Sequence, residues 1–347
     1  MEYISTILTQ FGLDPATCQV ERTGSGHINY TYLVSEPNRK FILQRINTNV
    51  FRQPELIATN LRIAADFLKI QDPDYLFLEA IRTTGGAEMA SDPDGQPWRL
   101  FPYIPNTVTL DKVDTLDQAY EAARGFGTLT RKLDGIDVSA FAPTIPRFQD
   151  LSWRFEQLQQ ALAGTTEERK NQAADAIRNA LEFGFLVDHY RNFTESGKLK
   201  PRVVHNDTKI NNILFHTQTG KSVCVIDLDT LMPGFFIYDL GDMVRTFVSP
   251  VSEEEADTRQ VMFRSDFYQA LLEGYLSVMD PSLLPEERPA IPFAGMMMTY
   301  IMAIRFLADF LNGNIYYQIH YPEQNLVRAR NQLALVRSIG EALHYRG

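Results

Sequence analysis

The segment from residue 203 to residue 229 constrains the fold of this chain more than any other, because it sets a dense group of polar side chains between apolar runs. It begins VVHNDTKINNILF and ends VIDLD. Polar side chains are costly to bury in such surroundings unless they bind something. The apolar runs predict short strands and the polar part predicts a loop between them. The fold must therefore hold this loop where a ligand can reach it.

The polar loop has the spacing H-x-D-x-K-x-x-N, from His205 to Asn212, and an acidic residue follows about fifteen residues later. Kinases need a carboxylate that accepts the proton of the attacking hydroxyl, and oxygen ligands that hold Mg²⁺. This pattern is typical of a kinase catalytic loop. We therefore predict that Asp207 is the catalytic base and that Asn212 and Asp227 bind magnesium. Lys209 is predicted to steady the phosphoryl group during transfer.

Other interpretations of these residues compete with this one. Asp207 or Asn212 alone would more often cap a turn, but their combination with Asp227 favours a kinase. The D-x-D pair Asp227 and Asp229 is also a metal motif of many glycosyltransferases, which leaves the upstream pattern unexplained. Alternate residues of a strand point the same way, so Asp229 either joins Asp227 at the metal or orients the catalytic loop.

The chain is predicted to change character near residue 103. Strands are expected at 18–23, 30–35, 39–47 and 75–83 and in a hairpin around DPDG, with helices at 2–11, 54–70, 115–133, 150–162, 166–196 and 294–311. We therefore predict an α+β, two-lobed, protein-kinase-like fold. Residues 1–103 would form a nucleotide-binding lobe, with a small antiparallel sheet and a helix. Residues 104–347 would form a larger, mainly helical lobe for catalysis and substrate binding, with the ligand between the lobes.

The sequence GSGHIN lies between the first two predicted strands, where glycines allow backbone N–H groups to approach phosphates closely. Gly24 and Gly26 fit the pattern G-x-G-x-x-G, but Asn29 replaces the third glycine. The sequence contains no G-x-x-x-x-G-K-[ST], which argues against a P-loop enzyme. We predict that Gly24, Gly26 and Asn29 contact ATP, although a lone G-x-G is more often a tight turn.

Two further segments are predicted to bind the nucleotide. In FILQRIN, a Gln–Arg pair stands where kinases usually place a lysine that grips the phosphates. We predict Arg45 for this role, with Gln44 as the alternative and a surface arginine as the competing interpretation. The backbone of Pro102, Tyr103 and Ile104, between the lobes, is predicted to recognise adenine.

Three residues are candidates for binding the second substrate, and each has a structural alternative. His27 either contacts the substrate or is an exposed turn residue. Arg305 lies in a very apolar helix and needs a partner. Asp309, four residues on, is expected to pair with it, unless Arg305 binds substrate oxygens instead. Tyr316 and Tyr317 either line a substrate site or are ordinary core residues.

The composition limits the class of protein. The chain has 347 residues, a formal net charge of −10 and two cysteines. The negative charge disfavours nucleic acid and anionic membranes as partners. Two distant cysteines fit a reducing cytoplasm and make no disulfide framework. The N-terminus lacks signal-peptide features, and the most apolar window, 294–311, contains Arg305 and Asp309, so we predict a buried helix and a cytoplasmic protein.

HNDTKINNILF followed by VIDLDTLMPG resembles the catalytic and metal-binding segments of the aminoglycoside phosphotransferase and choline kinase-like superfamily. Within it, GSGHINYTYLV, FILQRIN, RFLADFL with GNIYY, and YPEQNLVRARNQ resemble the N-acetylhexosamine 1-kinases, from about residue 24 to about residue 337. The resemblance implies ATP- and Mg²⁺-dependent phosphorylation of the anomeric hydroxyl of N-acetylglucosamine or N-acetylgalactosamine. It implies Asp207 as base, Asn212 and Asp227 as metal ligands, and His27, Arg305 and Tyr316 at the sugar.

Other acceptors and another class of protein remain open. Choline, homoserine or an aminoglycoside would be phosphorylated by the same chemistry, and a cationic acceptor would need an acidic or aromatic site, for which the acidic segment 251–260 is a candidate. A nucleotide-binding pseudokinase is expected to lack the base or a metal ligand, whereas all are present here. The expected partners are thus ATP and a small acceptor, bound by a monomer or small homo-oligomer.

Overall fold

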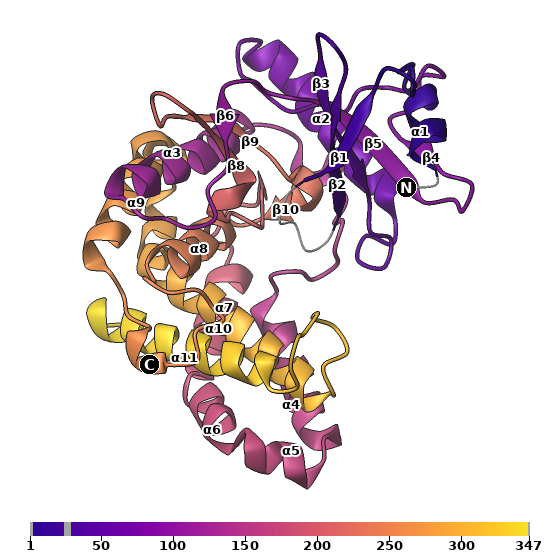
Figure 1. The fold of residues 1–347 in the computed structure, drawn as a ribbon. Coiled ribbons are helices and arrows are strands. Elements are labelled where there is room, and N and C mark those ends of the chain that lie inside the picture. Colours follow the sequence, from indigo (N-terminus) through magenta and orange to yellow (C-terminus); the bar gives the residue numbers. More distant parts are fainter. Residues whose placement is uncertain (1–2, 24–28, 346–347) are drawn as a thin grey trace.

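The computed structural model describes residues 3–23 and 29–345, with a small β-sheet at one end of the molecule and a larger helical part beneath it (Figure 1). The sheet is antiparallel, with five strands in the order β1-β2-β3-β5-β4. Its strands are β1 (Gln19–Arg22), β2 (Tyr30–Ser35), β3 (Lys40–Arg45), β4 (Ala90–Ser91) and β5 (Pro97–Pro102), and the accompanying helices are α1 (Ile4–Gln10) and α2 (Pro54–Gln71). The predicted α+β, two-lobed fold is confirmed.

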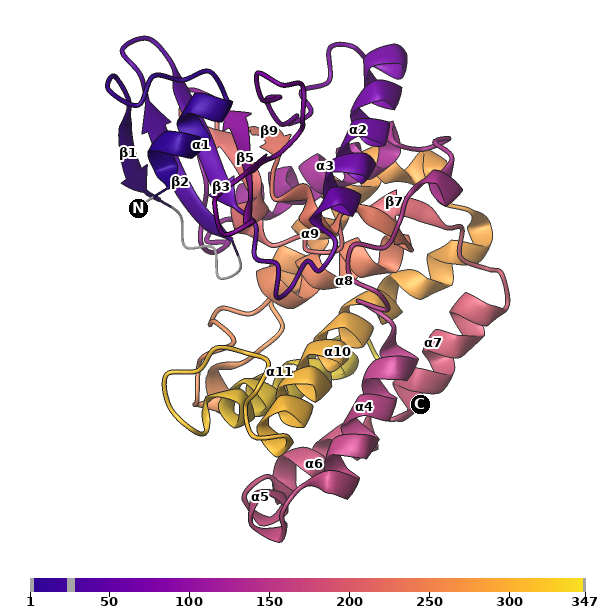
Figure 2. The same ribbon diagram turned by 90° about the vertical axis from the view of Figure 1, so that its right-hand side faces the viewer.

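The two faces of the sheet have different neighbours, because alternate residues of a strand point to opposite sides. On one face, Leu43 and Leu100 are buried in a core with Ile7 of α1, which lies on the outer side of the sheet (Figure 2). On the other face, Gln44 of β3 lies opposite Arg99 of β5 in the strand register. The sheet therefore turns polar side chains toward the large lobe.

The predicted strand at 75–83 is wrong. This segment forms a single antiparallel bridge, between Ile81 and Leu100, and no regular strand. The predicted DPDG hairpin is present, and its first strand, β4, already pairs with β5. Tyr75 and Phe77 pack against the larger hydrophobic core instead. Their apolar character therefore reflects contact with that core and not a place in the sheet.

The large lobe is organised around one central helix. Its helices are α3 (Leu116–Lys132), α4 (Leu151–Gly164), α5 (Glu167–Gln172), α6 (Ala174–Glu182), α7 (Phe185–Glu195), α8 (Phe236–Phe247), α9 (Ser265–Met279), α10 (Ile291–Leu311) and α11 (Gln324–Ala342). α10 packs against α4, α8 and α11 (Figure 1). The stretch Pro285–Leu311 is long and apolar enough to cross a membrane, but 78% of its most apolar window is buried inside the protein. The predicted buried helix is confirmed.

The single helical run predicted at 166–196 is divided into α5, α6 and α7. The first break is at Ala173, and the second lies between α6 and α7 at Phe183. The bends allow Ala176 and Ala180, which are both fully buried, to pack where α6 meets α10 and α11. The breaks therefore follow the shape of the neighbouring helices.

Two small sheets of the large lobe hold the polar loop. Their strands are β7 (Arg202–Val204) with β10 (Met232–Gly234), and β8 (Ile213–His216) with β6 (Thr107–Val108) and β9 (Ser222–Val225). The polar loop, 205–212, joins β7 to β8, and residues 226–231 join β9 to β10. Because both pairings are antiparallel, their register brings the two loops together.

Candidate active site

The polar loop is fixed in place by one buried carboxylate, that of Asp239 on α8. Its two oxygens accept the backbone N–H groups of His205, at 3.0 Å, and Asn206, at 2.7 Å. Its carbonyl accepts the hydroxyl of Thr208 at 2.7 Å. Burial raises the pKa of Asp239. Sequence analysis missed this residue, although a charge inside the apolar run FIYDLGDMV signals a buried hydrogen-bonding role.

His205 ties the polar loop to the segment after β9. Its Nε2 lies 2.9 Å from the carbonyl oxygen of Ile226, and its Nδ1 lies 3.2 Å from the backbone nitrogen of Asp207. These partners assign the proton to Nε2 and make Nδ1 an acceptor. Thr230 donates its hydroxyl to the carbonyl of His205 at 2.6 Å. The residue that follows Ile226, Asp227, is thereby held close to Asp207.

Asp207 is partly buried, and two neighbours shape its carboxylate. Lys209 Nζ lies 3.2 Å from Oδ1, and Asn212 Nδ2 donates to Oδ2 at 3.2 Å. Burial is the largest influence and alone would raise the pKa of Asp207, but the charge and hydrogen bond of Lys209, together with His205 and Arg245, outweigh it and hold the pKa below its usual range. Asp207 in turn raises the pKa of Lys209. An ionised carboxylate therefore stands beside a charged amine near neutral pH.

Asp227, at the end of β9, has a left-handed backbone conformation with φ 57° and ψ 53°. The residue is exposed to solvent, yet nearby protein atoms remove part of the hydration of its carboxylate. Loss of hydration there, followed by the charges of Asp229 and Asp207, raises its pKa to about 6. Asn212 lies next to it, because the carbonyl of Asn212 accepts the N–H of Ile226 at 2.9 Å. The structure thus brings Asp207, Asn212 and Asp227 together.

The donors of Asn212 and Asp227 fit a hard divalent cation. Asn212 turns its amide nitrogen toward Asp207, and its amide oxygen accepts no hydrogen bond from the described residues. A cation beside Asp227 would relieve the repulsion that raises its pKa. Within residues 3–23 and 29–345, no group of three or more His, Cys, Asp or Glu side chains forms a metal cage. Mg²⁺ usually keeps waters and takes substrate phosphate oxygens beside one or two protein ligands, so an open pair suits it.

The sheet turns Gln44, the alternative candidate, and Arg99 toward this site, whereas Arg45 faces away from it. Gln44 Oε1 accepts Arg99 Nε at 3.0 Å and Nη2 at 2.8 Å, and Arg99 Nη1 forms an ion pair with Asp229. Arg45 points to the opposite face, where its guanidinium lies 4.2 Å from the centre of the Tyr30 ring. Because alternation along β3 separates the two side chains, the geometry favours Gln44 and Arg99 over Arg45 for a place near phosphates.

Asn29, at the end of the glycine-rich segment, also reaches Asp229. Its Nδ2 donates to Asp229 Oδ2 at 2.7 Å, and its Oδ1 accepts the backbone N–H of Asn47 at 3.0 Å. Three predicted residues of this segment lie outside the described residues: Gly24, Gly26 and His27. The part that is described therefore connects the segment both to the end of β3 and to the metal-side loop.

The predicted adenine-binding stretch begins at the last residue of β5, Pro102. Tyr103 donates its N–H to the carbonyl of Lys40 at 3.1 Å, which keeps it against the sheet. The carbonyl of Ile104 accepts the hydroxyl of Thr107 at 2.7 Å, which ties it to β6. The stretch therefore spans the junction between the sheet and the large lobe.

The predicted ion pair between Arg305 and Asp309 is wrong. Asp309 lies near the end of α10, where its carboxylate accepts the backbone N–H groups of residues 315–317 at 2.9 to 3.0 Å. Arg305 lies among aromatic rings instead, 5.6 Å from the centre of the Tyr317 ring and 6.0 Å from that of Tyr316. In the part of the chain that the structure describes, Arg305 forms no ion pair. Tyr316 is 58% exposed.

A chain of contacts connects Arg305 with the polar loop. Its guanidinium lies 5.3 Å from the centre of the Phe148 ring. The next residue, Gln149, donates Nε2 to the carbonyl of Asn206 at 2.9 Å, directly before the predicted base. Gln149 Oε1 and Tyr317 Oη are buried and have no hydrogen-bond partner among the described residues. Since buried polar atoms usually find partners, these groups are suited to a ligand.

A comparison with known protein families identifies the class of this protein. Residues 19–275 match the phosphotransferase enzyme family. The match covers most of the chain, so the chain belongs to this family. The predicted enzyme class is confirmed: the protein is a small-molecule phosphotransferase that acts on alcohol groups.

Solved structures share this fold over nearly the whole chain. A microcompartment-associated aminopropanol kinase is 18% identical, with a TM-score of 0.65 over 99% of this chain and 98% of that chain. An amicoumacin kinase in complex with AMP-PNP and Ca²⁺ is 15% identical, with a TM-score of 0.61 over 95% and 92%. A choline/ethanolamine kinase family protein from Mesorhizobium loti is 17% identical, with a TM-score of 0.60 over 99% and 93%. At these identities the likeness establishes the fold, and the acceptor must be inferred from the site.

Proposed function

We propose that the protein is a cytoplasmic sugar 1-kinase, which uses ATP and Mg²⁺ to phosphorylate the anomeric hydroxyl of N-acetylglucosamine or N-acetylgalactosamine. The observation that carries this proposal is Arg305, which lies among the rings of Phe148, Tyr316 and Tyr317 without an ion pair in the described residues. Guanidinium N–H groups only donate hydrogen bonds, so they suit the hydroxyl and acetamido oxygens of a neutral sugar. Aromatic rings suit the apolar face of a sugar ring.

The charge around Arg305 disfavours a cationic acceptor such as choline or an aminoglycoside. Arg154 lies close enough that burial, followed by the charge of Arg305, lowers its pKa to about 9. Arg154 donates to the carbonyl of Phe148 at 2.9 Å and 3.2 Å. Two guanidinium groups on one side of the site would repel an ammonium group.

The acidic segment 251–260, the candidate for binding a cation, uses its carboxylates within the protein. Its ion pairs are Glu253 with Arg245, Glu254 with Arg328, and Asp257 with Arg259. Most of its negative charge is therefore already neutralised, which again supports a neutral acceptor.

In the proposed reaction, the sugar hydroxyl attacks the γ-phosphorus in line, with no covalent enzyme intermediate. Asp207 accepts the hydroxyl proton as the new O–P bond forms, and an anomeric hydroxyl is more acidic than an ordinary alcohol, which eases this step. Lys209 stabilises negative charge on the transferring group. Asn212 and Asp227 hold Mg²⁺, which when bound neutralises charge on the phosphates.

We propose that the nucleotide lies under the sheet. Gly24, Gly26 and Asn29 would contact its phosphates, and the backbone from Pro102 to Ile104 would contact adenine. Gln44 and Arg99 replace Arg45 in this proposal, because they lie on the face that meets the large lobe. His27 stays a predicted sugar contact, and the assembly stays predicted as a monomer or small homo-oligomer.

Homoserine is the second candidate acceptor, and the same observation favours it. Its carboxylate would pair with Arg305 and Arg154 in the bidentate way that arginine favours. Its ammonium group, however, would need a carboxylate nearby. Glu253 is held by Arg245 at 2.9 Å, so this pairing would compete with an existing one. We therefore rank homoserine below the neutral sugar.

An ADP-release assay with ATP and Mg²⁺ tests the proposal, on a panel of N-acetylglucosamine, N-acetylgalactosamine, glucose, choline, homoserine and kanamycin. Phosphorus NMR of any product gives the position of the phosphate. We expect a 1-phosphate of an N-acetyl sugar. Turnover of choline, homoserine or kanamycin alone would overturn the proposed acceptor and the sugar-side roles of His27, Arg305 and Tyr316, while leaving the enzyme class intact.

A further inference from the structure

Asp229 is a buried point where the two lobes meet through charged and polar contacts. Its side chain is 2% exposed. One carboxylate oxygen forms the ion pair with Arg99 of β5, and the other accepts Asn29 Nδ2 at 2.7 Å. From the large lobe, Thr144 donates its hydroxyl to the carbonyl of Asp229 at 2.7 Å. Both partners of the carboxylate belong to the sheet lobe, whereas Asp229 belongs to the loop that carries Asp227.

Protein kinases have an ion pair between a strand lysine and a helix glutamate, and the described residues of this sheet lobe show no equivalent pair at β3. Here the inward residue of β3 is Gln44, and it binds Arg99 instead of an acid. The early acidic residue of α2, Glu55, is exposed. The charged residues further along α2 point to the segment at 79–88.

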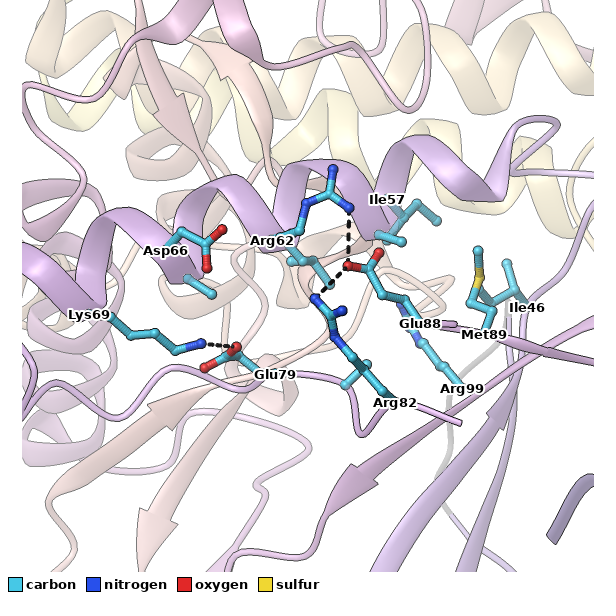
Figure 3. Close-up of a pocket in the computed structure, with 14 residues that line it drawn as sticks. Ile46, Ile57, Arg62, Asp66, Lys69, Glu79, Arg82, Glu88, Met89 and Arg99 are labelled. Atoms are coloured by element: carbon cyan, nitrogen blue, oxygen red, sulfur yellow. Dashed lines mark hydrogen bonds and ion pairs between the residues drawn. The ribbon is translucent and has the colours of Figure 1, made fainter. Parts of the chain in front are cut away.

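Figure 3 shows a cavity that Arg99 lines and the ion pairs that the charged residues of α2 form there. A cavity of about 120 Å³ lies between α2 and the segment that precedes β4, and Arg99 lines it. On its rim Arg62 pairs with Glu88 at 3.2 Å and Lys69 pairs with Glu79 at 2.6 Å (Figure 3). Arg62 and Lys69 of α2 therefore form ion pairs along this rim and not with Arg99. The acid that neutralises Arg99 is Asp229, from the metal-side loop.

We propose that Asp229 is a positioning residue that couples Asn29 and Arg99 of the sheet lobe to the metal-binding turn, and that it is not itself a metal ligand. Each of its oxygens is already engaged, one by the ion pair with Arg99 and the other by Asn29, so a cation would have to share or displace these contacts. The coupling explains why Asn replaces the third glycine of the usual pattern, since a glycine has no side chain to bond Asp229 and Asn47 at once. Asp227 needs such support, because its left-handed conformation is unfavourable for a non-glycine residue. The inference rests on the proposed use of ATP and Mg²⁺.

Asn29→Ala and Asn29→Gly test the coupling at a partly exposed site where folding is not at risk. Removing a hydrogen bond to a buried carboxylate should raise the KM for ATP, and the dissociation constant of AMP-PNP with Mg²⁺ measured by calorimetry, by about tenfold. The KM for the acceptor should not change. Asn49→Ala, at an exposed position two residues after Asn47, is the matched control and should leave all three values unchanged. Unchanged nucleotide binding in both Asn29 variants would overturn the proposal.

Asp229→Asn, alone and combined with Asn29→Ala, separates coupling from metal binding. If the two residues act as one unit, the double variant binds AMP-PNP with Mg²⁺ about as weakly as the weaker single variant. If Asp229 is a metal ligand, the two losses multiply and Asp229→Asn raises the Mg²⁺ requirement far more than Asn29→Ala does, which would overturn the proposal. Calorimetry needs no acceptor, so failure of the proposed sugar leaves this test valid.

Discussion

The loop that carries Asp207 and the cluster around Arg305 satisfy their polar groups in opposite ways. In the loop, the backbone N–H groups of residues 205–207 find partners inside the protein, and Asp239 accepts those of His205 and Asn206. Around Arg305, the guanidinium has no ion pair among the described residues and donates only to Met302 Sδ, and two buried atoms, Gln149 Oε1 and Tyr317 Oη, have no hydrogen-bond partner there. Catalysis requires side chains held in a fixed geometry by other parts of the protein, as in the loop of Asp207. Polar groups without a partner, as around Arg305, can be satisfied by a bound ligand.

Asp207→Asn should have the largest effect, because it removes the proposed base and preserves the shape of the loop. We expect kcat to fall by about 10² to 10⁴. Binding of AMP-PNP, measured by calorimetry, should stay close to that of the parent protein, since Asp207 faces the acceptor. Asp188→Asn, on the exposed surface of α7, is the control. Near-normal turnover in Asp207→Asn would show that Asp207 is not the base. The comparison of a catalytic loop with an acceptor-binding cluster would then not hold.

Asp239→Asn tests whether the loop is held from within. An amide has one acceptor oxygen, so either His205 or Asn206 loses its backbone partner. An unsatisfied buried N–H costs about 1 to 3 kcal/mol, so urea unfolding should show a loss of stability of that size. We expect kcat to fall as well, because Asp207 follows directly. An unfolding midpoint and kcat equal to those of the parent would show that the loop has other supports.

Arg305→Met should affect only the acceptor. It removes the donors and keeps much of the apolar volume beside Phe148. Loss of a hydrogen bond to a charged donor should raise the KM for the N-acetyl sugar about tenfold to a hundredfold. The KM for ATP should not change. Arg178→Met, on the exposed face of α6, is the control. A rise in both KM values would instead indicate that Arg305 supports the fold.

The sequence predicted those parts of the fold that depend on local pattern. Alternation over 30–35 and helical spacing over 54–70 correspond to β2 and α2. The segment 75–83 has a similar apolar pattern, but its place at the sheet edge is taken by β4, which no local pattern reveals. The breaks within 166–196 likewise depend on the surface of α10 and α11, because a helix bends to fit what it packs against.

The same limit separates the site residues that were predicted from those that were missed. Asp207, Asn212 and Asp227 were found because one short motif and its spacing contain them. Arg99 was missed because only the pairing of β3 with β5 sets it opposite Gln44. The spacing of Arg305 and Asp309 predicted an ion pair, but Asp309 lies where a helix ends and free N–H groups compete for it. Partners distant in sequence decided each of these cases.

The smallest predicted effect concerns pH and separates Asp227 from Asp207. The pKa of Asp227 is raised from 3.8 to about 6, whereas that of Asp207 is lowered. Below about pH 6 Asp227 is therefore protonated in the metal-free protein and must lose its proton to bind Mg²⁺. We expect the Mg²⁺ affinity, measured by calorimetry with AMP-PNP, to fall about three- to tenfold between about pH 7 and about pH 5.5.

The sign of the same shift predicts how stability changes with pH. The folded, metal-free protein favours the protonated form of Asp227, so this residue stabilises the fold at low pH and loses that contribution as the pH rises from about 4 through about 6. Mg²⁺ favours the ionised form and should offset the loss. In Asp227→Asn the Mg²⁺ affinity should be weak at every pH. If the Mg²⁺ affinity of the parent protein also did not change with pH, Asp227 would not titrate at the cation site. Its carboxylate would then be bound by groups of the protein, as that of Asp239 is.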